Sequence, residues 1–554
     1  MPCVRPSAVT VVIVMCVAFV LPASAPAASP VPAARGPVFS VVELAFEGPA
    51  CGPTDAPARD MTLTARFRHE SGTPAVTVHG FWDGDGRGGV RGNVFKVRFC
   101  PTTAGRWTLE AVESNVASLD GQREGAAVLA TPSDHPGFWM PDPDSPDGRW
   151  YRRSDGSHPY LYGNTHYTFL SRMTRDGPRR DDRGIAEDVR ANARCFRKLR
   201  FGVHGGRYTH PDAKPYVDDA GRPTDDGDFS HRPNPAWFHE RVDAAVAAAY
   251  ECDLVADIIL SGPDTREARA ALRAGAGGGD PTPYLRYMAA RYGAYPNVWF
   301  CLANEWNIKD PHFSAEAVRR AGRILRRYLP YPTPVSIHGR PADWDRALNA
   351  DPPWHDHVIL QGKIKRLAKS ADFIARNVAR GGGVPVVNDE LGYEGRGDEF
   401  SRDDVIEGHL GAFLGGGYGT TGHKPGSKTG HYFWGGFRLE EHTAARHLAW
   451  LRRIIDARIA FWTMRPVAAE KTCFKGLPDS ARAMVSGDGR HVVLGTREAT
   501  KEIVANLPDG AWRIVRYDVI AMKEKVLAQR AEGRFAFPAP ASRAVLFHFQ
   551  WVGE

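Results

Sequence analysis

The chain has 554 residues and a hydrophobic content of 43%, which is enough for about two to four domains with cores of their own. Its net charge of +7 arises from arginines spread along the whole chain, which favours a solvated surface over a nucleic-acid-binding face. We therefore expect no nucleic-acid partner.

The first residues have the pattern of an export signal. Arg5 precedes an apolar run over residues 8–21, and the small residues over 22–27 suit a cleavage site. The apolar run is too short for a stable membrane insertion. We therefore predict a signal peptide at residues 1–27, an Ala/Pro-rich linker at 28–36, and a secreted or periplasmic protein.

A β-sandwich is predicted over residues 37–130. Apolar and polar residues alternate over 61–68 and over 95–99, which is the period of half-buried strands. The turn at 80–86 contains Asp83 and Asp85, but Arg87 stands where a calcium loop needs a ligand, so we expect a hairpin turn and no metal site. Because export is expected, Cys51 and Cys100 could form a disulfide in this domain.

After a Pro/Asp-rich linker at 131–149, residues 150–464 alternate between short apolar runs and helical patterns. Eight such units over about 300 residues predict a (β/α)8 TIM barrel, in which ligands bind at the carboxyl ends of the strands. The runs predicted as strands are 160–163, 199–203, 254–260, 298–303, 334–337, 357–360, 384–388 and 418–421.

Two of these runs end on acidic residues. One leads into Asn304-Glu305-Trp306, and the other leads into Asp389-Glu390. Hydrolysis of a glycosidic bond needs two carboxyl groups, one on each side of the scissile bond. A salt bridge at the barrel rim would explain either glutamate alone, but the pair on one barrel favours catalysis.

Beyond residue 464 the pattern returns to short strands, at 491–494, 512–515 and 544–549. Turns such as Pro508-Asp509-Gly510 separate them. A second β-sandwich is therefore predicted at 465–554. The predicted fold class is multidomain α/β, with the barrel flanked by an N-terminal and a C-terminal β-sandwich.

Family resemblances add to this interpretation. Residues 76–86, 97–101 and 105–108 resemble a sandwich domain of unassigned function that precedes glycoside-hydrolase barrels. Residues 295–299, 302–306, 336–338, 388–395 and 433–436 resemble the retaining glycoside hydrolases that place Asn-Glu after strand four and Glu after strand seven. Within that clan they resemble the apiosidase-like group, some members of which carry a collagenase label. No H-E-x-x-H zinc motif occurs, so the sequence does not support that label.

The resemblance implies roles for individual residues. Glu305 would be the acid/base and Glu390 the nucleophile, with Asp389 as the alternative nucleophile. Asn304 would bind the hydroxyl beside the reacting carbon, and His338 would line the site. The substrate would be a glycan or polysaccharide, and no metal or organic cofactor would be required.

Five further side chains are candidates for substrate binding. His166, His204 and Arg207 follow the first two strands, where side chains converge on the barrel mouth. Trp306 and Trp434 could stack on a sugar ring, whose face is apolar, although tryptophans also serve in simple packing.

Two alternatives stay open at this point. A degenerate barrel could bind carbohydrate without catalysis, and a polysaccharide lyase would use a Tyr/His or Lys base beside an arginine that neutralises a uronate. The sugar, its linkage, exo or endo action and the oligomeric state are not determined by the sequence, because many substrates share this fold and this carboxylate pair.

Overall fold

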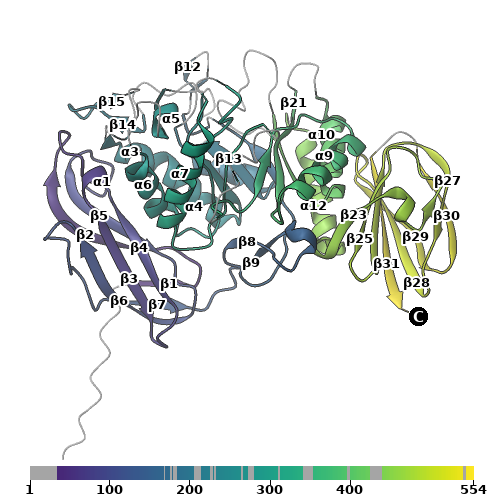
Figure 1. Cartoon of the computed structure of the whole chain (residues 1–554), viewed down its shortest axis with the longest axis horizontal. Helices are drawn as coiled ribbons and strands as arrows, with labels where there is room; N and C mark the ends of the chain where they lie inside the picture. Colours follow the sequence, from purple (N-terminus) through teal and green to yellow (C-terminus); the bar gives the residue numbers. More distant parts are fainter. Residues whose placement is uncertain are drawn as a thin grey trace, which may run out of the picture.

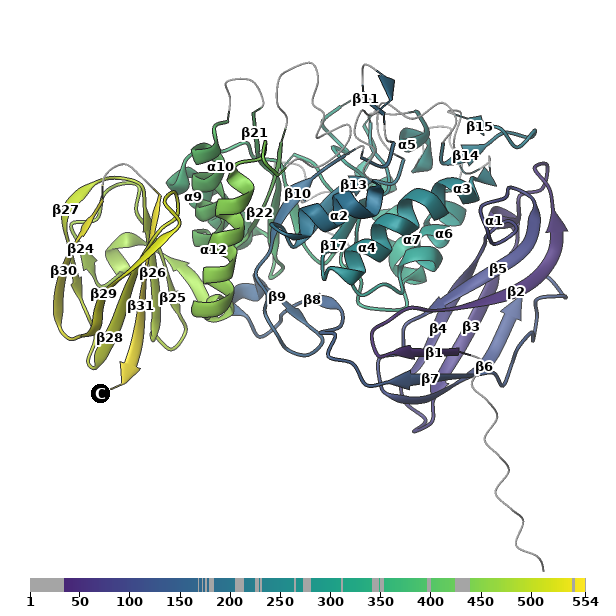
Figure 2. The same ribbon diagram turned by 180° about the vertical axis from the view of Figure 1, so that it is seen from behind.

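The structure is a computed structural model that describes residues 34–553 with internal gaps. The gaps are at 168, 172, 175–176, 179–183, 205–213, 225–228, 230–231, 264–265, 273–279, 310–311, 341–347, 349–352, 396–399, 424–438 and 541–543. The predicted signal peptide and linker residues 28–33 lie outside the described residues. Within the described ranges, no helix is both long and apolar enough to cross a membrane. An α/β part lies between two β-rich parts (Figures 1 and 2).

The N-terminal part has the strand order β1-β7-β6-β3-β4-β5-β2. Strand β4 joins two layers, because its first half pairs with β3 and its last three residues pair with β5. The layers pack face to face, and Phe67 stacks on Phe99 with ring centroids 4.1 Å apart. The elements are β1 Ala34–Pro37, β2 Val42–Cys51, α1 Pro57–Asp60, β3 Leu63–His69, β4 Ala75–Trp82, β5 Gly92–Phe99, β6 Gly105–Ser114 and β7 Ala127–Thr131. Strand β1 therefore includes residues 34–36, which the sequence assigned to the linker.

Cys51 and Cys100 do not form the disulfide that the sequence allowed, and both thiols are free and buried. Strands β2 and β5 pair antiparallel, with Val42 opposite Phe99 and Cys51 opposite Gly92. Cys100 therefore lies at the far end of the strand pair from Cys51, about 30 Å away at ~3.4 Å per residue. A disulfide needs Cα atoms within about 7 Å of each other.

The central part is a parallel, barrel-like sheet in the order β19-β18-β17-β13-β10-β22-β21-β20. Its two edges meet, because His338 after β19 forms a parallel bridge with Ile359 of β20. Each predicted apolar run overlaps one of these strands. Strand β13 begins one residue before its run, and β10, β21 and β22 continue two to six residues beyond theirs. The bounds are β10 Tyr162–Thr165, β13 Lys198–Gly202, β17 Val255–Ile259, β18 Val298–Cys301, β19 Val335–Ser336, β20 Val358–Leu360, β21 Val386–Glu394 and β22 Tyr418–His423.

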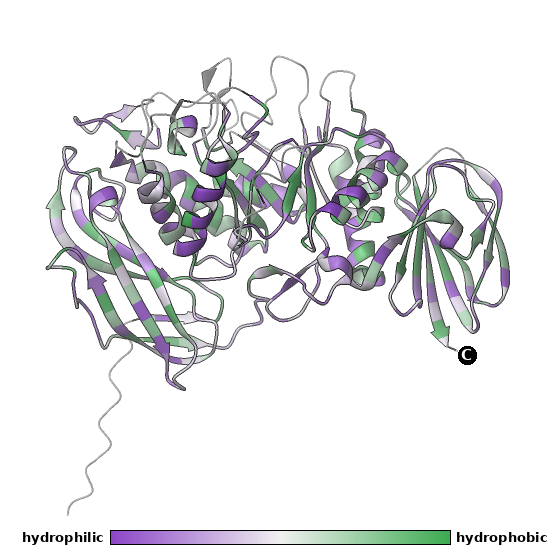
Figure 3. Cartoon of the chain, viewed as in Figure 1, coloured by the Kyte–Doolittle hydropathy of each residue, from purple (hydrophilic) through white to green (hydrophobic). Residues whose placement is uncertain are grey.

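Helices surround this sheet, and in Figure 3 the barrel strands are mostly hydrophobic while α7 carries a hydrophilic face. Local sequence sets several helix starts: Ser314 caps α7, and Ser401 with Asp404 forms a capping box at α10. The helical elements are η2 Phe169–Ser171, α2 Ile185–Ala193, α3 Pro235–Trp237, η3 Phe238–Asp243, α4 Ala244–Glu251, α5 Arg266–Ala271, α6 Thr282–Tyr292, α7 Ala315–Tyr328, α9 Leu367–Arg380, α10 Arg402–Leu414 and α12 Ala444–Arg458. Short strands in the loops are β11 Met173–Thr174, β12 Gly177–Pro178, β14 Tyr216–Val217, β15 Pro223–Thr224 and β16 Arg232–Pro233.

The predicted linker at 131–149 and the C-terminal part are both structured. The linker contains β8 Trp139–Pro141, which pairs with β9 Tyr151–Arg153, and the short helix η1 Pro146–Gly148. The C-terminal part has a six-stranded sheet, β23-β25-β26-β31-β28-β29, and a three-stranded sheet, β24-β27-β30. Its elements are η4 Phe461–Thr463, β23 Met464–Val467, η5 Ala469–Lys471, β24 Phe474–Lys475, β25 Arg482–Ser486, β26 His491–Thr496, β27 Thr500–Asn506, β28 Ala511–Asp518, β29 Lys523–Ala531, β30 Arg534–Ala539 and β31 Val545–Gly553.

A buried ion-pair network joins the N-terminal part to the barrel helices. Asp83, directly after β4, is fully buried and lies 2.7 Å from Nη1 of Arg291 in α6. Asp243 of η3 lies 2.7 Å from the same guanidinium and 2.9 Å from Arg98 of β5. The aspartate that the sequence placed in a simple hairpin turn therefore anchors two domains to each other.

Candidate active site

Two glutamates meet at the carboxyl ends of the barrel strands. Glu305 follows β18 and Glu390 lies within β21, and both are buried, with 6% and 5% of their surface exposed. Glu305 has a φ of +47°, a left-handed backbone conformation that is uncommon for a residue with a side chain. Backbone strain of this kind clusters at functional sites, where the surrounding structure holds it in place.

Gln361, directly after β20, contacts both carboxylates. Its Nε2 donates a hydrogen bond of 3.0 Å to Oε1 of Glu305 and another of 3.0 Å to Oε2 of Glu390. Because one nitrogen reaches both oxygens, these oxygens are no more than about 6 Å apart. Paired carboxyl groups are ~5–5.5 Å apart in retaining glycosidases and ~6.5–9.5 Å apart in inverting ones.

Tyr167 contacts Glu390 from the side of the first strand. Its hydroxyl donates to Oε1 of Glu390 at 2.6 Å and accepts from Nη1 of Arg200 at 3.0 Å. Burial and the negative charge of Glu305 raise the pKa of Glu390, and the Tyr167 hydrogen bond and the charge of Arg200 offset only part of this rise. Glu390 therefore holds a proton more readily than an exposed glutamate would.

Lys309 lies on the other side of Glu305. Its Nζ is 2.5 Å from Oε2 of Glu305, which lies four residues earlier in the chain. Since Gln361 donates to Oε1, both oxygens of Glu305 contact donors. In its carboxylate form this group can accept a proton from a water molecule that enters the site.

The side chain of Asn304 is held in one orientation. Its Oδ1 accepts from Nη2 of Arg200 at 2.9 Å and from Nδ1 of His338 at 2.5 Å. Burial and the charge of Arg200 hold the pKa of His338 well below its usual range, so the ring is neutral with its proton on Nδ1. The oxygen of Asn304 is thus occupied, and its amide nitrogen is left to donate to a ligand.

Asp389 occupies a different environment from its neighbour Glu390. It is fully buried, and its Oδ1 lies 2.5 Å from Nζ of Lys198, which also contacts Asp257 at 2.7 Å. Burial acts to raise the pKa of Asp389, but the charges of Lys198 and Arg200 outweigh burial and hold the pKa at about 2. Asp389 is the ionised partner of a lysine in the barrel interior, whereas Glu390 faces Glu305.

The histidines predicted to bind substrate are packed into the protein. His166 is fully buried and stacks on Phe169 with centroids 4.8 Å apart. His204 is 3% exposed, and its Nε2 lies 3.0 Å from the hydroxyl of Tyr216. His338 contacts Asn304 and is likewise fully buried. His338 reaches the site through its contact with Asn304, and the substrate-binding roles of His166, His204 and His338 stay predictions.

The remaining predicted binding residues are tryptophans and an arginine. Trp306 is 5% exposed and packs closely on Gly339, where a Cβ atom would lie 2.3 Å from the indole nitrogen. Arg207 and Trp434 lie outside the described residues. Their predicted roles therefore stay predictions.

Four described residues of the site have no role in the sequence-based prediction: Tyr167, Arg200, Lys309 and Gln361. Arg200 lies within a predicted strand and Gln361 directly follows one, whereas Tyr167 follows the candidate His166 and Lys309 comes four residues after Glu305. Arg200 is fully buried between apolar neighbours, and a charged residue inside an apolar run is a signal that could have identified it. Strand ends give positions in the chain, but the convergence of these side chains depends on how the strands pair.

Glu394, at the end of β21, is a structural glutamate. Its carboxylate accepts hydrogen bonds from the backbone nitrogens of Thr443 at 3.2 Å and Ala444 at 2.9 Å. These nitrogens belong to the start of α12, where a negative charge is favourable. A strand-end glutamate on this barrel is thus not automatically part of the carboxylate pair.

The arrangement can transfer protons and supply a nucleophile across a gap between two carboxylates. Among the described residues, no group of three or more His, Cys, Asp or Glu side chains is placed to hold a metal ion. Arg200 is fully buried against Asn304 and Tyr167, so it is not placed to neutralise a uronate as the lyase alternative requires.

Comparisons with known proteins identify the family of the barrel region. The family model described as "Apiosidase-like, catalytic domain" matches residues 145–424. A model described as a domain of unknown function, DUF5060, matches residues 36–114, which cover most of the predicted first sandwich at 37–130. No curated protein gives a significant match.

Two solved structures share the fold. A presumed glycoside hydrolase from Bacteroides vulgatus ATCC 8482 aligns with a TM-score of 0.71 at 20% identity, covering 94% of this chain and 99% of that one. A glycoside hydrolase family 5 protein from the same organism aligns with a TM-score of 0.54 at 13% identity, covering 75% of this chain and 93% of that one. At these identities the likeness shows the fold of a barrel with β-rich additions.

Proposed function

Because this chain belongs to the family of apiosidase-like catalytic domains, we propose that it is a glycoside hydrolase that cleaves a glycan or polysaccharide with retention of configuration. The sheet would be a (β/α)8 barrel flanked by two sandwiches. Glu390 would be the nucleophile and Glu305 the acid/base. The observation that carries this proposal is the contact of Gln361 with both carboxylates, since the scissile bond must fit between two groups at this spacing.

The proposed reaction has two steps. In the first, a carboxylate oxygen of Glu390 attacks the anomeric carbon while Glu305 gives its proton to the departing glycosidic oxygen, so the C–O bond breaks and a glycosyl ester forms. In the second, Glu305 takes a proton from water, the water oxygen attacks the anomeric carbon, and the ester bond to Glu390 breaks. The sugar is released, Glu305 again carries its proton, and Glu390 is again a carboxylate.

The surrounding side chains support these roles. Tyr167 orients Glu390 through its hydrogen bond, and it can keep the departing carboxylate solvated in the second step. Asn304 presents its amide nitrogen to the hydroxyl beside the reacting carbon, because its oxygen is held by Arg200 and His338. For the first step the substrate must displace the donors on Glu305, which are Lys309 and Gln361.

Export to the periplasm or the medium completes the proposal, and it is supported by the apolar run at 8–21. An exported protein of this kind would meet its glycan outside the cytoplasm. No cofactor takes part in the proposed steps.

The test is hydrolysis of a panel of aryl glycosides, both furanosides and pyranosides and including an apioside, with the product anomer followed by NMR. Glu305→Gln and Glu390→Gln should each lower kcat/KM by about 10³-fold or more. Glu394→Gln is the matched control, because it changes a buried strand-end glutamate outside the pair and should keep activity. An inverted product would refute the double displacement, and normal activity of either pair variant would remove that residue from its role.

A further inference from the structure

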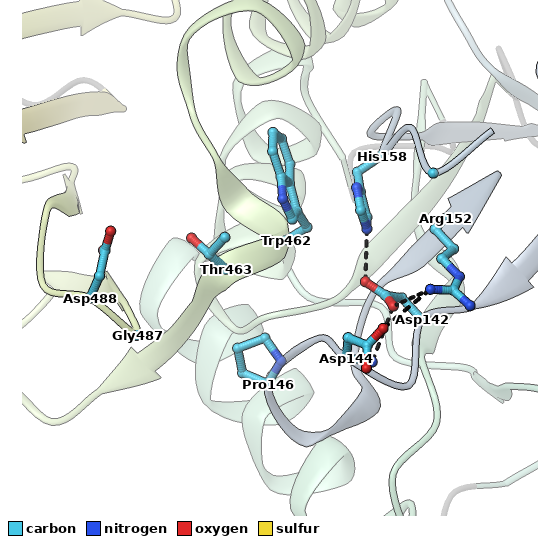
Figure 4. A pocket seen from close by; sticks show the side chains of 10 residues that line it. Asp142, Asp144, Pro146, Arg152, His158, Trp462, Thr463, Gly487 and Asp488 are labelled. Atoms are coloured by element: carbon cyan, nitrogen blue, oxygen red, sulfur yellow. Dashed lines mark hydrogen bonds and ion pairs between the residues drawn. The ribbon is translucent and has the colours of Figure 1, made fainter. Parts of the chain in front are cut away.

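A cavity of about 470 Å³ lies beneath the barrel, away from the glutamates. Its walls come from the linker after β8, from β9 and the turn that follows it, from η4, and from the turn between β25 and β26 (Figure 4). Figures 1 and 2 place β8 and β9 below the barrel. Since His158 precedes β10 and Trp462 follows α12, the cavity lies at the amino ends of the strands, opposite the end that carries Glu305 and Glu390.

The inner wall of the cavity is aromatic. The imidazole of His158 stacks on the indole of Trp462, with centroids 5.0 Å apart and ring planes 9° apart. Asp142, which is 4% exposed, fixes the imidazole through a contact of 2.7 Å between its Oδ2 and Nε2 of His158. Trp462 is only partly buried and lines the cavity, so part of its indole surface meets solvent there.

The rim of the cavity carries hydrogen-bonding groups from two parts of the chain. Arg152 lies 3.4 Å from Asp142 and 3.3 Å from Asp144, so it holds the two linker carboxylates. Asp144 has 86% of its side chain exposed. Asp488 belongs to the turn between β25 and β26 in the C-terminal part, and Figure 4 shows it on the side of Trp462 away from His158. Its Oδ1 accepts a hydrogen bond from Oγ of Ser486 at 2.6 Å.

The indole and the carboxylates that line the cavity favour a neutral sugar as its ligand. A partly exposed indole offers an apolar plane for the C–H face of a sugar ring, and carboxylates accept hydrogen bonds from hydroxyl groups. Three carboxylates line the cavity against one guanidinium, so a sugar acid would meet net repulsion. The volume lies within the range of ~300–1,000 Å³ that is usual for small-molecule sites.

We propose that this cavity is a second, non-catalytic binding site for a neutral saccharide, with Trp462 as its platform and Asp144 and Asp488 as hydrogen-bond acceptors at its rim. The choice of a saccharide rests on the proposed hydrolase function. Because its walls come from the linker, the barrel and the C-terminal part, the site exists only when these parts are docked. It would hold one stretch of a polymeric glycan while another stretch occupies the carboxylate pair.

The experiment uses the full chain carrying Glu390→Gln, so that bound sugar is not hydrolysed. Calorimetric titration measures binding of neutral gluco-, xylo-, manno-, galacto- and arabino-oligosaccharides and of oligogalacturonides at millimolar concentrations. Trp462→Ala should weaken binding of at least one neutral oligosaccharide about tenfold. Asp144→Ala, which changes an exposed side chain and leaves the core intact, should weaken the same ligand about threefold to tenfold. Asp134→Ala is its control, an exposed linker aspartate outside the cavity.

Three results would overturn the proposal: no binding that depends on Trp462 for any probe, an Asp144→Ala effect no larger than that of Asp134→Ala, or stronger Trp462-dependent binding of oligogalacturonides than of neutral probes. Hydrolysis of aryl glycosides by the wild type and by Trp462→Ala separates this proposal from the hydrolase function. Both proteins should turn over these small substrates equally. Absence of turnover by the wild type of both the aryl glycosides and the oligosaccharide that binds, with Trp462-dependent binding intact, would refute the hydrolase and retain the saccharide site.

Discussion

The ion-pair network between the N-terminal part and the barrel yields a quantitative prediction for Asp83→Asn. Asp83 is fully buried, and its carboxylate contacts Arg291 at 2.7 Å, Lys96 at 2.8 Å and His239 at 2.8 Å. Asparagine keeps the shape of the side chain and removes its charge. The variant therefore tests how much the buried charge itself stabilises the docked domains.

The magnitude follows from the partners that remain. Breaking a buried ion pair by removing one member costs about 3–5 kcal/mol, because it leaves an uncompensated charge. In Asp83→Asn, however, Lys96 keeps Glu43 at 2.9 Å and Arg291 keeps Asp243 at 2.7 Å. We therefore expect a loss of about 3 kcal/mol in the free energy of unfolding, at the lower end of that range.

The pH dependence has a defined sign. Burial acts to raise the pKa of Asp83, but the hydrogen bond with His239 and the charge of Arg291 outweigh burial, so the folded pKa lies below its usual range. A lowered folded pKa contributes stability that is present above the unfolded value of about 3.9 and is lost as pH falls below it. The difference between wild type and Asp83→Asn should therefore shrink as the pH drops below about 4.

Urea unfolding at pH 7 and at lower pH, followed by tryptophan fluorescence, measures both effects. Hydrogen exchange across β4 and α6 shows whether the loss is at the interface. Asp85→Asn is the control, because Asp85 lies in the same turn, is exposed, and accepts local backbone hydrogen bonds from Arg87 and Gly89. Equal stabilities for the two variants would refute the interpretation that the buried charge anchors the domains.

Three further predictions concern the site and its frame. Tyr167→Phe removes a hydrogen bond that lowers the pKa of Glu390, so the acidic limb of the pH profile of kcat/KM should move to higher pH; a limb that stays in place would contradict the contact. Azide should restore turnover and give a glycosyl azide with Glu390→Ala but not with Asp389→Ala, and the reverse result would make Asp389 the nucleophile. Glu394→Ala should lower the free energy of unfolding by about 0.5–2 kcal/mol through the loss of the α12 cap, with near-normal kcat, and calorimetry with an activity assay checks both.

The order of apolar runs determined much of the candidate site in advance. A short run ended by Asn304-Glu305 and another ended by Asp389-Glu390 predicted that both glutamates lie at the ends of parallel strands, and the structure brings them together through Gln361. This worked because burial on both faces of a strand leaves a continuous apolar signature, and the end of that signature marks the mouth of the barrel.

Pairing and register decided what the local pattern could not. The pairing of β21 with β22 is irregular between Asn388 and Gly392. In this stretch Asp389 contacts Lys198 in the interior while Glu390 shares Gln361 with Glu305, although the two residues are neighbours at the same place in the pattern. Cys51 and Cys100 lie in the same domain, but the antiparallel pairing of β2 with β5 puts them at opposite ends of the strand pair. The sequence pattern around Asp83 predicts only a turn, and its ion pair with Arg291 depends on the packing of α6 against that turn.

The amino-acid sequence by itself determined the periodicities, and with them the strands, the helices and the chain positions of the two glutamates. Only the tertiary structure decided which side chains contact them: Tyr167, Gln361, Lys309 and, through Asn304, Arg200. The physical reason is that periodicity depends on the burial of each segment alone, whereas a hydrogen-bonded site depends on distances between segments up to 223 residues apart in the chain. Closure of the barrel sets those distances.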